Sequence, residues 1–277
     1  MMTERQRNFR RQYVEQISPW YNGLVHIGVM YAAGISAIWW CVGRMHGASW
    51  EWLLVVPVAV AGNFAEWAMH KYVMHRLIDV FALRAIYDRH TRQHHQYFTD
   101  NDATIHTIRE FRIVFFPWRV LMVLAVGGGL LAWLASLVIS ANAGYVVFVT
   151  MIGHYMVYET FHFCCHIPEN VWLRHVPLVN TIRRHHVAHH NMGIMMHVNM
   201  NLTLPIADWA MKTSDLERGL VGHVFNGYDE THVKDELKPV IVRFRAGETQ
   251  DARCTLDGPK LDADEVRALE RAGGLVG

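Results

Sequence analysis

Histidines in this chain are grouped at spacings that suit metal coordination. The sequence has 19 histidines but only 4 cysteines, and no Cys-x-x-Cys pair occurs, so a metal site would be built on imidazole. Ten histidines fall into four clusters: His70 and His75; His90, His94 and His95; His162 and His166; His186, His189 and His190. A single ion takes four to six ligands, so ten imidazoles that converge predict two metal ions held close together.

The spacing within each cluster predicts which imidazoles share a face. Side chains three or four residues apart lie on one face of an α-helix, about 5 to 6 Å apart at Cβ. Four pairs have this spacing: His90 and His94, His162 and His166, His186 and His189, His186 and His190. His70 and His75 are five residues apart, so we expect His75 to lie beyond the helix end or on a distorted turn.

Polar residues near the clusters are candidates to orient the ligand imidazoles, as metal-bound histidines normally require. These candidates are Glu66, Asp88, His154, Glu159, His185, Asn191 and Asp208. Each is also of a residue type that commonly forms structural hydrogen bonds, so both interpretations stay open. His185 and His186 compete for one ligand position, and we expect His186 to be the ligand.

Four apolar runs must position these clusters. They span residues 24–42, 52–69, 120–140 and 143–161, and each approaches the roughly 20 residues that cross about 30 Å of hydrocarbon. A soluble protein with buried helices is the alternative, but four such runs exceed what an ordinary soluble domain carries. The mean hydropathy is only +0.07 because polar segments offset the runs. The net charge of +1 argues against a nucleic-acid-binding protein.

Basic residues predict how the runs are oriented in a membrane. Residues 3–12 contain four arginines and residues 71–112 contain seven basic residues, whereas residues 43–51 and 141–142 contain only Arg44. Cytosolic loops carry the excess of Lys and Arg, so both termini are expected to be cytosolic. The second and fourth runs then end on the cytosolic side, where all four histidine clusters can converge.

The predicted fold class is an all-α, multi-pass integral membrane protein with four transmembrane helices. Residues 1–23 are expected to form a cytosolic N-terminal segment without a removable signal peptide, and residues 24–215 to form the membrane domain that carries the clusters. Residues 216–277 form a small cytosolic tail. Within this tail, residues 238–244 predict a short strand, and Asp262 begins a predicted helix.

The clusters together resemble the histidine boxes of the membrane fatty acid hydroxylase/sterol desaturase superfamily. The matching patterns are Glu66-x3-His70-x4-His75, His90-x3-His94-His95, His162-x3-His166 and His185-His186-x2-His189-His190. Residues 202–209 (LTLPIADW) also resemble the segment that follows the last box, and the resemblance covers about residues 50–215. It implies four membrane helices under a cytosolic helical cap that holds two iron ions. Zinc can replace the iron in recombinant material.

The resemblance implies an O2-dependent monooxygenase that hydroxylates a lipid acyl group. Attack on an unactivated C–H bond requires a redox-active metal, and zinc is not redox-active. The metal performs the difficult chemical step, while the protein positions the substrate. We expect no fused haem domain, so a separate electron-transfer protein is expected to supply electrons. The expected substrate is a membrane lipid or fatty acyl group. The bacterial inner membrane is expected rather than the endoplasmic reticulum.

Three other functions remain open. A sterol or carotenoid oxidase or desaturase of the same superfamily would share the same ligands and differ in its apolar pocket. A member of the separate acyl-lipid desaturase family normally has three boxes, so the His162 and His166 pair disfavours it. A histidine-rich metal transporter would need polar residues through its spans, and residues 120–140 contain no polar side chain except serine.

Overall fold

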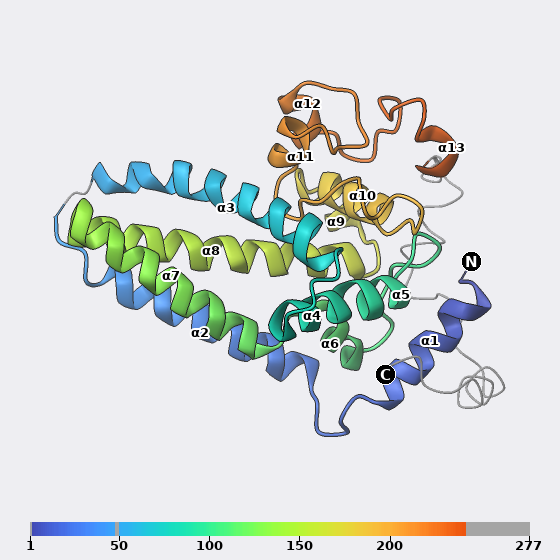
Figure 1. Cartoon of the computed structure of the whole chain (residues 1–277), viewed down its shortest axis with the longest axis horizontal. Coiled ribbons are helices and arrows are strands. Elements are labelled where there is room, and N and C mark those ends of the chain that lie inside the picture. The colour runs from blue at the N-terminus through green and yellow to red at the C-terminus, as the bar shows by residue number, and fades with distance from the viewer. Residues whose placement is uncertain (1, 48–49, 242–277) are drawn as a thin grey trace.

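The computed structural model describes residues 2–47 and 50–241, and this part of the chain is mostly helical. The described residues contain no β-strand and only two isolated bridges, between Thr99 and Asp102 and between Leu216 and Val233. Long helices gather at one end of the molecule and short helices at the other (Figure 1). The expected all-α class is therefore confirmed for the described residues.

Four long helices form the apolar end of the molecule. They are α2 (Gly23–Val42), α3 (Val55–Met69), α7 (Trp118–Val138) and α8 (Ala141–His166). Three segments are long and apolar enough to cross a membrane, namely α2, α7 and Trp50–Met74, which contains α3. These three segments indicate a membrane protein.

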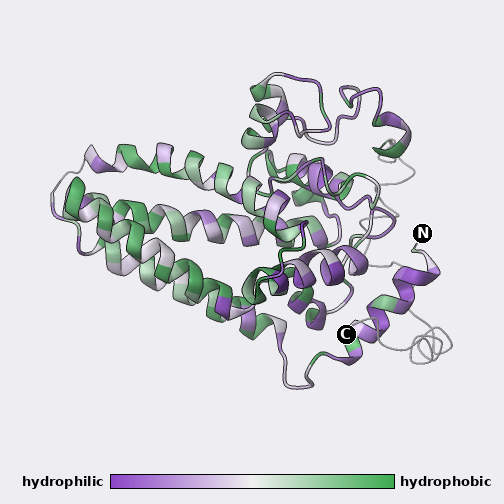
Figure 2. Ribbon diagram, in the orientation of Figure 1, coloured by the Kyte–Doolittle hydropathy of each residue, from purple (hydrophilic) through white to green (hydrophobic). Residues whose placement is uncertain are grey.

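The outer surfaces of these helices are apolar. Val123 and Val126 on α7 are each 71% exposed, and Trp39 near the end of α2 is 81% exposed. Figure 2 shows hydrophobic residues along the long helices and hydrophilic residues concentrated among the short ones. Exposure of large apolar side chains to water is unfavourable, so a lipid environment fits this end of the protein.

Helix α8 packs against α2, α3 and α7. Ser140 caps the start of α8, because its hydroxyl accepts a hydrogen bond from the backbone N–H of Ala143 at 3.1 Å. Gly144 allows close approach to α7, because a Cβ there would lie 2.6 Å from the Ala132 carbonyl oxygen. The fourth apolar run of the sequence lies within α8, but α8 is not among the three segments that are apolar enough to cross a membrane.

The short helices form a second layer that we call the short-helix region. Its helices are α1 (Glu4–Glu15), α4 (Phe81–Tyr87), α5 (His95–Tyr97), α6 (Phe111–Val114), α9 (Val171–His175), α10 (Val179–His189), α11 (Ile206–Ala210), α12 (Leu220–Val224) and α13 (Lys238–Ile241). Helix α1 packs against α5. Its Phe9 and Tyr13 enter the largest buried apolar cluster, beside Tyr97, Phe98 and Phe115.

Shorter helical turns connect these elements. Two of them are 3-10 turns, η1 (Trp50–Leu54) and η4 (Ile108–Glu110), and two are π-helical, η2 (His70–Met74) and η3 (Asp88–His94). Both π-helical turns contain histidines of the predicted clusters.

The C-terminal part of the described chain differs from the sequence prediction. Residues 238–241 form the short helix α13 instead of the start of a strand. Ile241 and Val240 pack against Leu216 and Val233, and no strand of the described residues lies there to pair with this segment. The remainder of the predicted strand and the helix predicted at Asp262 lie outside the described residues.

Candidate metal centre

Nine of the ten clustered histidines form two compact groups in the short-helix region. In each group the ligand nitrogens lie within 4.8 Å of one another, and every member is buried. The first group is His70, His75, His90, His95 and His189. The second group is His94, His166, His186 and His190. His162 lies beside the second group, because its Nε2 is 3.2 Å from the Nε2 atoms of both His94 and His166.

Two π-helical turns place histidines that are five residues apart on one face. In η2 the backbone N–H of His75 donates to the carbonyl of His70 at 3.1 Å, and in η3 the N–H of His95 donates to the carbonyl of His90. Such an i→i+5 bond inserts one extra residue into the turn. The ring centroids of His70 and His75 are therefore only 4.9 Å apart.

Local contacts support the first π-helical turn. The rings of Trp67 and Tyr72, also five residues apart, meet edge to face with centroids 5.6 Å apart. The Thr91 hydroxyl donates to the Met74 carbonyl at 2.7 Å and so satisfies an acceptor at the end of the turn. The distorted turn expected from the spacing of His70 and His75 is thus a π-helical turn.

The structure separates two pairs that their spacing predicted would act together. His90 and His94 belong to different groups, because the π-helical turn pairs His90 with His95. His186 and His189 also belong to different groups, although both lie on α10. A spacing of three or four residues is therefore not sufficient to predict a shared ion.

Two other pairs have the predicted proximity. The Nε2 atoms are 3.2 Å apart in His162 and His166 and 2.9 Å apart in His186 and His190. Both pairs are four residues apart on regular helices, α8 and α10, so their side chains stack one turn above another.

Hydrogen bonds to backbone carbonyls fix the tautomers of five imidazoles. A carbonyl oxygen can only accept, so the Nδ1 atom that contacts it carries the hydrogen, and Nε2 of the neutral ring keeps its lone pair. The five contacts are His70 with Met200, His94 with Ile113 at 3.2 Å, His166 with Ala103 at 2.7 Å, His189 with Val198 at 2.8 Å, and His190 with Phe98 at 2.8 Å.

His75 has the same tautomer for a different reason. The Thr91 hydroxyl already donates its hydrogen to Met74, so it can only accept from Nδ1 of His75, at 3.2 Å. The bare Nε2 of His75 then lies 3.1 Å from that of His70 and 3.0 Å from that of His189. Facing lone pairs at these distances repel each other, and a cation placed between them removes the repulsion. The donor set therefore fits a metal ion.

The separations between neighbouring nitrogens also fit coordination. With a metal–nitrogen bond of about 2.0 to 2.1 Å, two ligands lie about 2.9 Å apart at a right angle and about 3.4 Å apart at a tetrahedral angle. The Nε2 atoms of directly neighbouring imidazoles in the first group lie 2.8 Å apart for His70 and His90 and 3.3 Å apart for His75 and His90. In the second group His166 and His186 are 3.1 Å apart.

The two groups are adjacent. The ring centroids of His95, in the first group, and His190, in the second, are 4.4 Å apart. Helix α10 contributes His189 to the first group and His186 to the second, and His190 follows at its end. This arrangement can hold two ions side by side.

Burial keeps these imidazoles neutral, which is the form that binds metal. Loss of hydration lowers the pKa of His75 to about 2, with a further contribution from the neighbouring His70. Burial likewise lowers the pKa of His190 to about 3. The pKa values of His94 and His95 are also held well below the usual value, mainly by burial.

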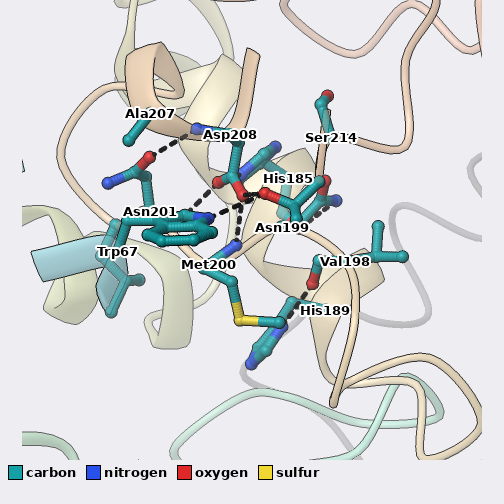
Figure 3. A network of polar contacts seen from close by, with 12 residues as sticks. Trp67, His185, His189, Val198, Asn199, Met200, Asn201, Ala207, Asp208 and Ser214 are labelled. Atoms are coloured by element: carbon teal, nitrogen blue, oxygen red, sulfur yellow. Dashed lines mark hydrogen bonds and ion pairs between the residues drawn. The ribbon is translucent and has the colours of Figure 1, made fainter. Parts of the chain in front are cut away.

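Asp208 and His185 support the first group from outside it (Figure 3). The Asp208 carboxylate lies 3.0 Å from Nε2 of His185 and accepts hydrogen bonds from the N–H groups of Met200, at 3.0 Å, and Asn201, at 2.7 Å. The Met200 carbonyl in turn accepts from His70. Asp208 therefore positions the peptide that orients a cluster imidazole. His185 contacts Asp208, while its neighbour His186 belongs to the second group.

Glu66 and His154 interact with each other instead of with a cluster imidazole. Oε2 of Glu66 lies 3.2 Å from Nε2 of His154 and accepts from the Thr203 hydroxyl at 2.7 Å. Glu66 also accepts from the backbone N–H groups of Leu202 and Thr203. It thus fixes the segment that follows Met200.

The other three candidate orienting residues have partners elsewhere. Asp88 pairs with Arg92 at 3.3 Å and with Arg84 at 4.0 Å on the surface. Asn191 donates to Asp100 at 2.8 Å. Glu159 is buried and accepts from the backbone N–H of Phe116 at 3.2 Å. None of these contacts reaches a cluster imidazole.

Asn63 was not among the residues singled out for this site, yet it holds the same segment as Glu66. Its side-chain amide donates to the Leu204 carbonyl at 2.7 Å and its oxygen accepts from the Ala207 N–H at 3.0 Å. The Asn201 side chain donates to the Asn63 carbonyl at 3.0 Å. A polar residue within an otherwise apolar run was the available signal.

Two cavities lie in very different surroundings. One, of about 250 Å³, lies between α1 and residues 95–101 and has His95 in its wall. The other, of about 350 Å³, lies between α2, α7 and α8 and is lined mainly by apolar residues such as Trp40, Trp133 and Phe148. The second cavity is at the opposite end of the long helices from the histidines and is not part of the candidate centre.

Comparison of the sequence and structure with protein-family models, with curated proteins and with solved structures gave no match.

Proposed function

We propose that the protein is a membrane-bound, O2-dependent lipid hydroxylase that uses two iron ions to insert oxygen into a C–H bond of an acyl group. The observation that carries this proposal is the pair of adjacent groups of buried imidazoles, in which the bare Nε2 of His75 faces those of His70 and His189. Their position at the end of helices that can cross a membrane favours a substrate drawn from the bilayer.

The first group would hold one ion and the second group, with His162 beside it, would hold the other. When bound, two iron ions supply the redox chemistry that reduces O2 with two external electrons and two protons, yielding one hydroxylated product and one water. Histidine nitrogens suit iron as well as zinc, and only iron has the redox activity that this reaction needs.

The protein's own residues would orient the ligands and exclude water. Backbone carbonyls fix the imidazole tautomers, Asp208 fixes the Met200 peptide, and Phe98 covers one side of the centre by stacking on His166 with ring centroids 4.0 Å apart. Burial of the ligands would keep bulk water away from a reactive centre. Because α3 and α8 run from the apolar end directly to the histidines, a lipid tail could approach along them.

The proposed topology has four spans, with α8 as the fourth, and a cytosolic cap formed by the short-helix region. Of the polar residues of α8 near the centre, Glu159 is fully buried and the half-buried His154 pairs with Glu66, which makes the span compatible with lipid. Both termini would be cytosolic, and the bacterial inner membrane is the proposed location. A separate electron-transfer protein would deliver electrons.

A sterol or carotenoid oxidase or desaturase would use the same ligands, and it stays the alternative within this class of enzyme. A metal transporter is less well supported, because the cavity at the far end of the bundle has walls of Trp40, Trp133 and Phe148 instead of a polar path.

The direct test incubates purified protein in lipid nanodiscs with iron, a reductant and ¹⁸O2, followed by mass spectrometry of the lipids. Hydroxylation adds 18 mass units from ¹⁸O2, whereas desaturation removes 2 and would overturn the hydroxylase proposal. The His189→Ala variant should bind less iron than the unaltered protein and should form no hydroxylated lipid. His175→Ala is the matched control, because His175 is exposed on α9 outside both groups. A transporter would instead move metal across the membrane without altering lipid.

A further inference from the structure

We propose that Arg10, on α1, is a positioning residue for the second metal group and is needed for an ion to bind there. The inference rests on the proposed metal pair. Arg10 would act through the segment 97–104, whose backbone carbonyls orient two of the four histidines in that group.

The Arg10 side chain is 2% exposed and is hydrogen-bonded to both ends of this segment. Its Nε donates to the Tyr97 carbonyl at 2.7 Å, and its Nη1 donates to the Thr104 carbonyl at 2.9 Å. Its Nη2 donates to the Asp102 carbonyl at 2.9 Å and lies 3.3 Å from the Asp102 carboxylate. The planar guanidinium, with five N–H donors, is the one side chain that can make this set of contacts.

The segment held by Arg10 orients two cluster imidazoles. The Phe98 carbonyl, next to Tyr97, accepts from Nδ1 of His190 at 2.8 Å. The Ala103 carbonyl, next to Thr104, accepts from Nδ1 of His166 at 2.7 Å. Each orienting carbonyl is thus one residue away from a carbonyl that Arg10 fixes, and rotation of either peptide would turn an imidazole away from the ion.

A second contact runs through side chains. The Arg10 guanidinium carbon lies 5.3 Å from the centroid of the Phe98 ring, and that ring stacks on His166 at 4.0 Å with an interplanar angle of 20°. One turn earlier on α1, Gln6 donates to the Tyr97 carbonyl at 3.0 Å and to the Asp102 carbonyl at 2.6 Å. Helix α1 is therefore fixed to the segment by two buried side chains.

Three of the five imidazoles in the first group are oriented by other parts of the protein. His70 and His189 donate to the carbonyls of Met200 and Val198, and His75 donates to Thr91. The hydrogen bonds of Arg10 reach none of these three acceptors. Loss of Arg10 should therefore empty the second group selectively, which a general loss of stability would not do.

The test counts iron per protein molecule by elemental mass spectrometry after anaerobic loading with ferrous iron. Arg10→Gln keeps a polar side chain but removes the planar, five-donor guanidinium. Arg10→Lys keeps the positive charge and changes the packing less than Arg10→Gln does. We expect two ions in the unaltered protein, one in Arg10→Gln, and a value between one and two in Arg10→Lys. Arg5→Gln, on the exposed face of the same helix, should keep two.

Double variants show whether the effect is local. Arg10→Gln added to His186→Ala, which already disables the second group, should cause no further loss of iron. Added to His75→Ala, which disables the first group, it should leave the protein with no iron. If folded Arg10→Gln or Arg10→Lys keeps two ions, or if Arg10→Gln lowers the iron content of His186→Ala, the proposal is overturned. If Arg10→Gln does not fold, Arg10→Lys in the same two backgrounds decides the question.

These outcomes are separate from failure of the proposed function. Unaltered protein that binds fewer than two ions contradicts the metal pair itself. Unaltered protein that binds two ions but yields no oxidised lipid contradicts the hydroxylase assignment and leaves the role of Arg10 standing.

Discussion

The Nε2 atom of His75 lies 3.0 Å from the Nε2 atom of His189, and neither nitrogen carries a hydrogen. A hydrogen bond between them is therefore excluded by the tautomers that Thr91 and Val198 impose. This contact joins η2 to α10, which are far apart in the sequence. It indicates that the folded protein holds unfavourable lone-pair repulsion that a bound cation would relieve.

Metal should therefore stabilise the protein. Addition of ferrous iron or Zn²⁺ to metal-free protein should raise the unfolding temperature, since a ligand at 100 times its Kd stabilises the folded state by about 2.7 kcal/mol. Differential scanning calorimetry of the detergent-solubilised protein measures the shift. The double variant His75→Ala, His94→Ala, which removes one ligand from each group, should show no rise. An unchanged unfolding temperature in the unaltered protein would contradict a metal site.

Acid should destabilise the metal-free protein through its buried histidines. Burial lowers the folded-state pKa of His75 to about 2 and of His190 to about 3, from the unfolded value of 6.5. Between those values the unfolded state binds more protons than the folded state, so stability falls as the pH drops below about 6.5 and continues to fall until about 3. Above about pH 7 these groups contribute no slope.

Urea unfolding of metal-free protein at a series of pH values from about 4 to about 8 tests this dependence. Replacing His190 by Gln should reduce the slope on the acid side of about pH 6.5, whereas replacing the exposed His175 should not. A stability that is constant over the whole series would show that the cluster imidazoles are not buried in the neutral form.

Loss of the Asp208 carboxylate should weaken metal binding at the first group. Asp208→Asn keeps the size of the side chain but replaces one of the two carboxylate oxygens with an NH2 group. The carboxylate oxygens of Asp208 accept hydrogen bonds from Met200, Asn201 and Thr213 and contact His185, so the single oxygen of asparagine cannot make all of these contacts. The Met200 peptide that orients His70 is then less well fixed. Loss of such outer contacts typically costs about 10- to 100-fold in metal affinity.

Competition titration with a Zn²⁺ chelator measures that affinity. Asp88→Asn is the control, because Asp88 pairs with Arg84 and Arg92 on the surface, and its affinity should be unchanged. Equal affinities for Asp208→Asn and Asp88→Asn would separate Asp208 from the metal centre.

The close contact between α7 and α8 should tolerate no added methyl group. A Cβ at Gly144 would lie 2.6 Å from the Ala132 carbonyl oxygen and 2.9 Å from Cβ of Ser136, so Gly144→Ala should destabilise the bundle by about 1–3 kcal/mol. Gly129→Ala, in α7, has no atom within 4 Å of the added Cβ and should be neutral or slightly stabilising. Thermal unfolding in the same detergent compares the two, and a Gly144→Ala protein as stable as Gly129→Ala would refute this packing.

The sequence was sufficient to locate the long helices and the histidines. The apolar runs at residues 24–42 and 120–140 correspond to α2 (Gly23–Val42) and α7 (Trp118–Val138) within two residues, because apolar composition alone determines such helices. All ten clustered histidines meet in the short-helix region, as their grouping predicts. Whether they bind two irons stays a prediction.

The partition of the histidines between two groups could not be predicted. It depends on two π-helical turns, and no residue type marks such a turn in the way that proline or glycine marks others. Arg10 was counted only as a positive charge near a membrane, although the folded protein buries it against three carbonyls. Long-range contacts of this kind carry no signal in a single sequence.

The acceptors that orient the imidazoles are main-chain carbonyls, for example those of Ile113 and Val198. A carbonyl is present whatever the residue type. Other residues of similar size can therefore replace Ile113 and Val198 while His94 and His189 keep their direction. A substitution at such a position changes the side chain and leaves the orienting acceptor in place, so these positions constrain the sequence less than Thr91, Asp208 or Arg10 does, whose side chains make the contacts.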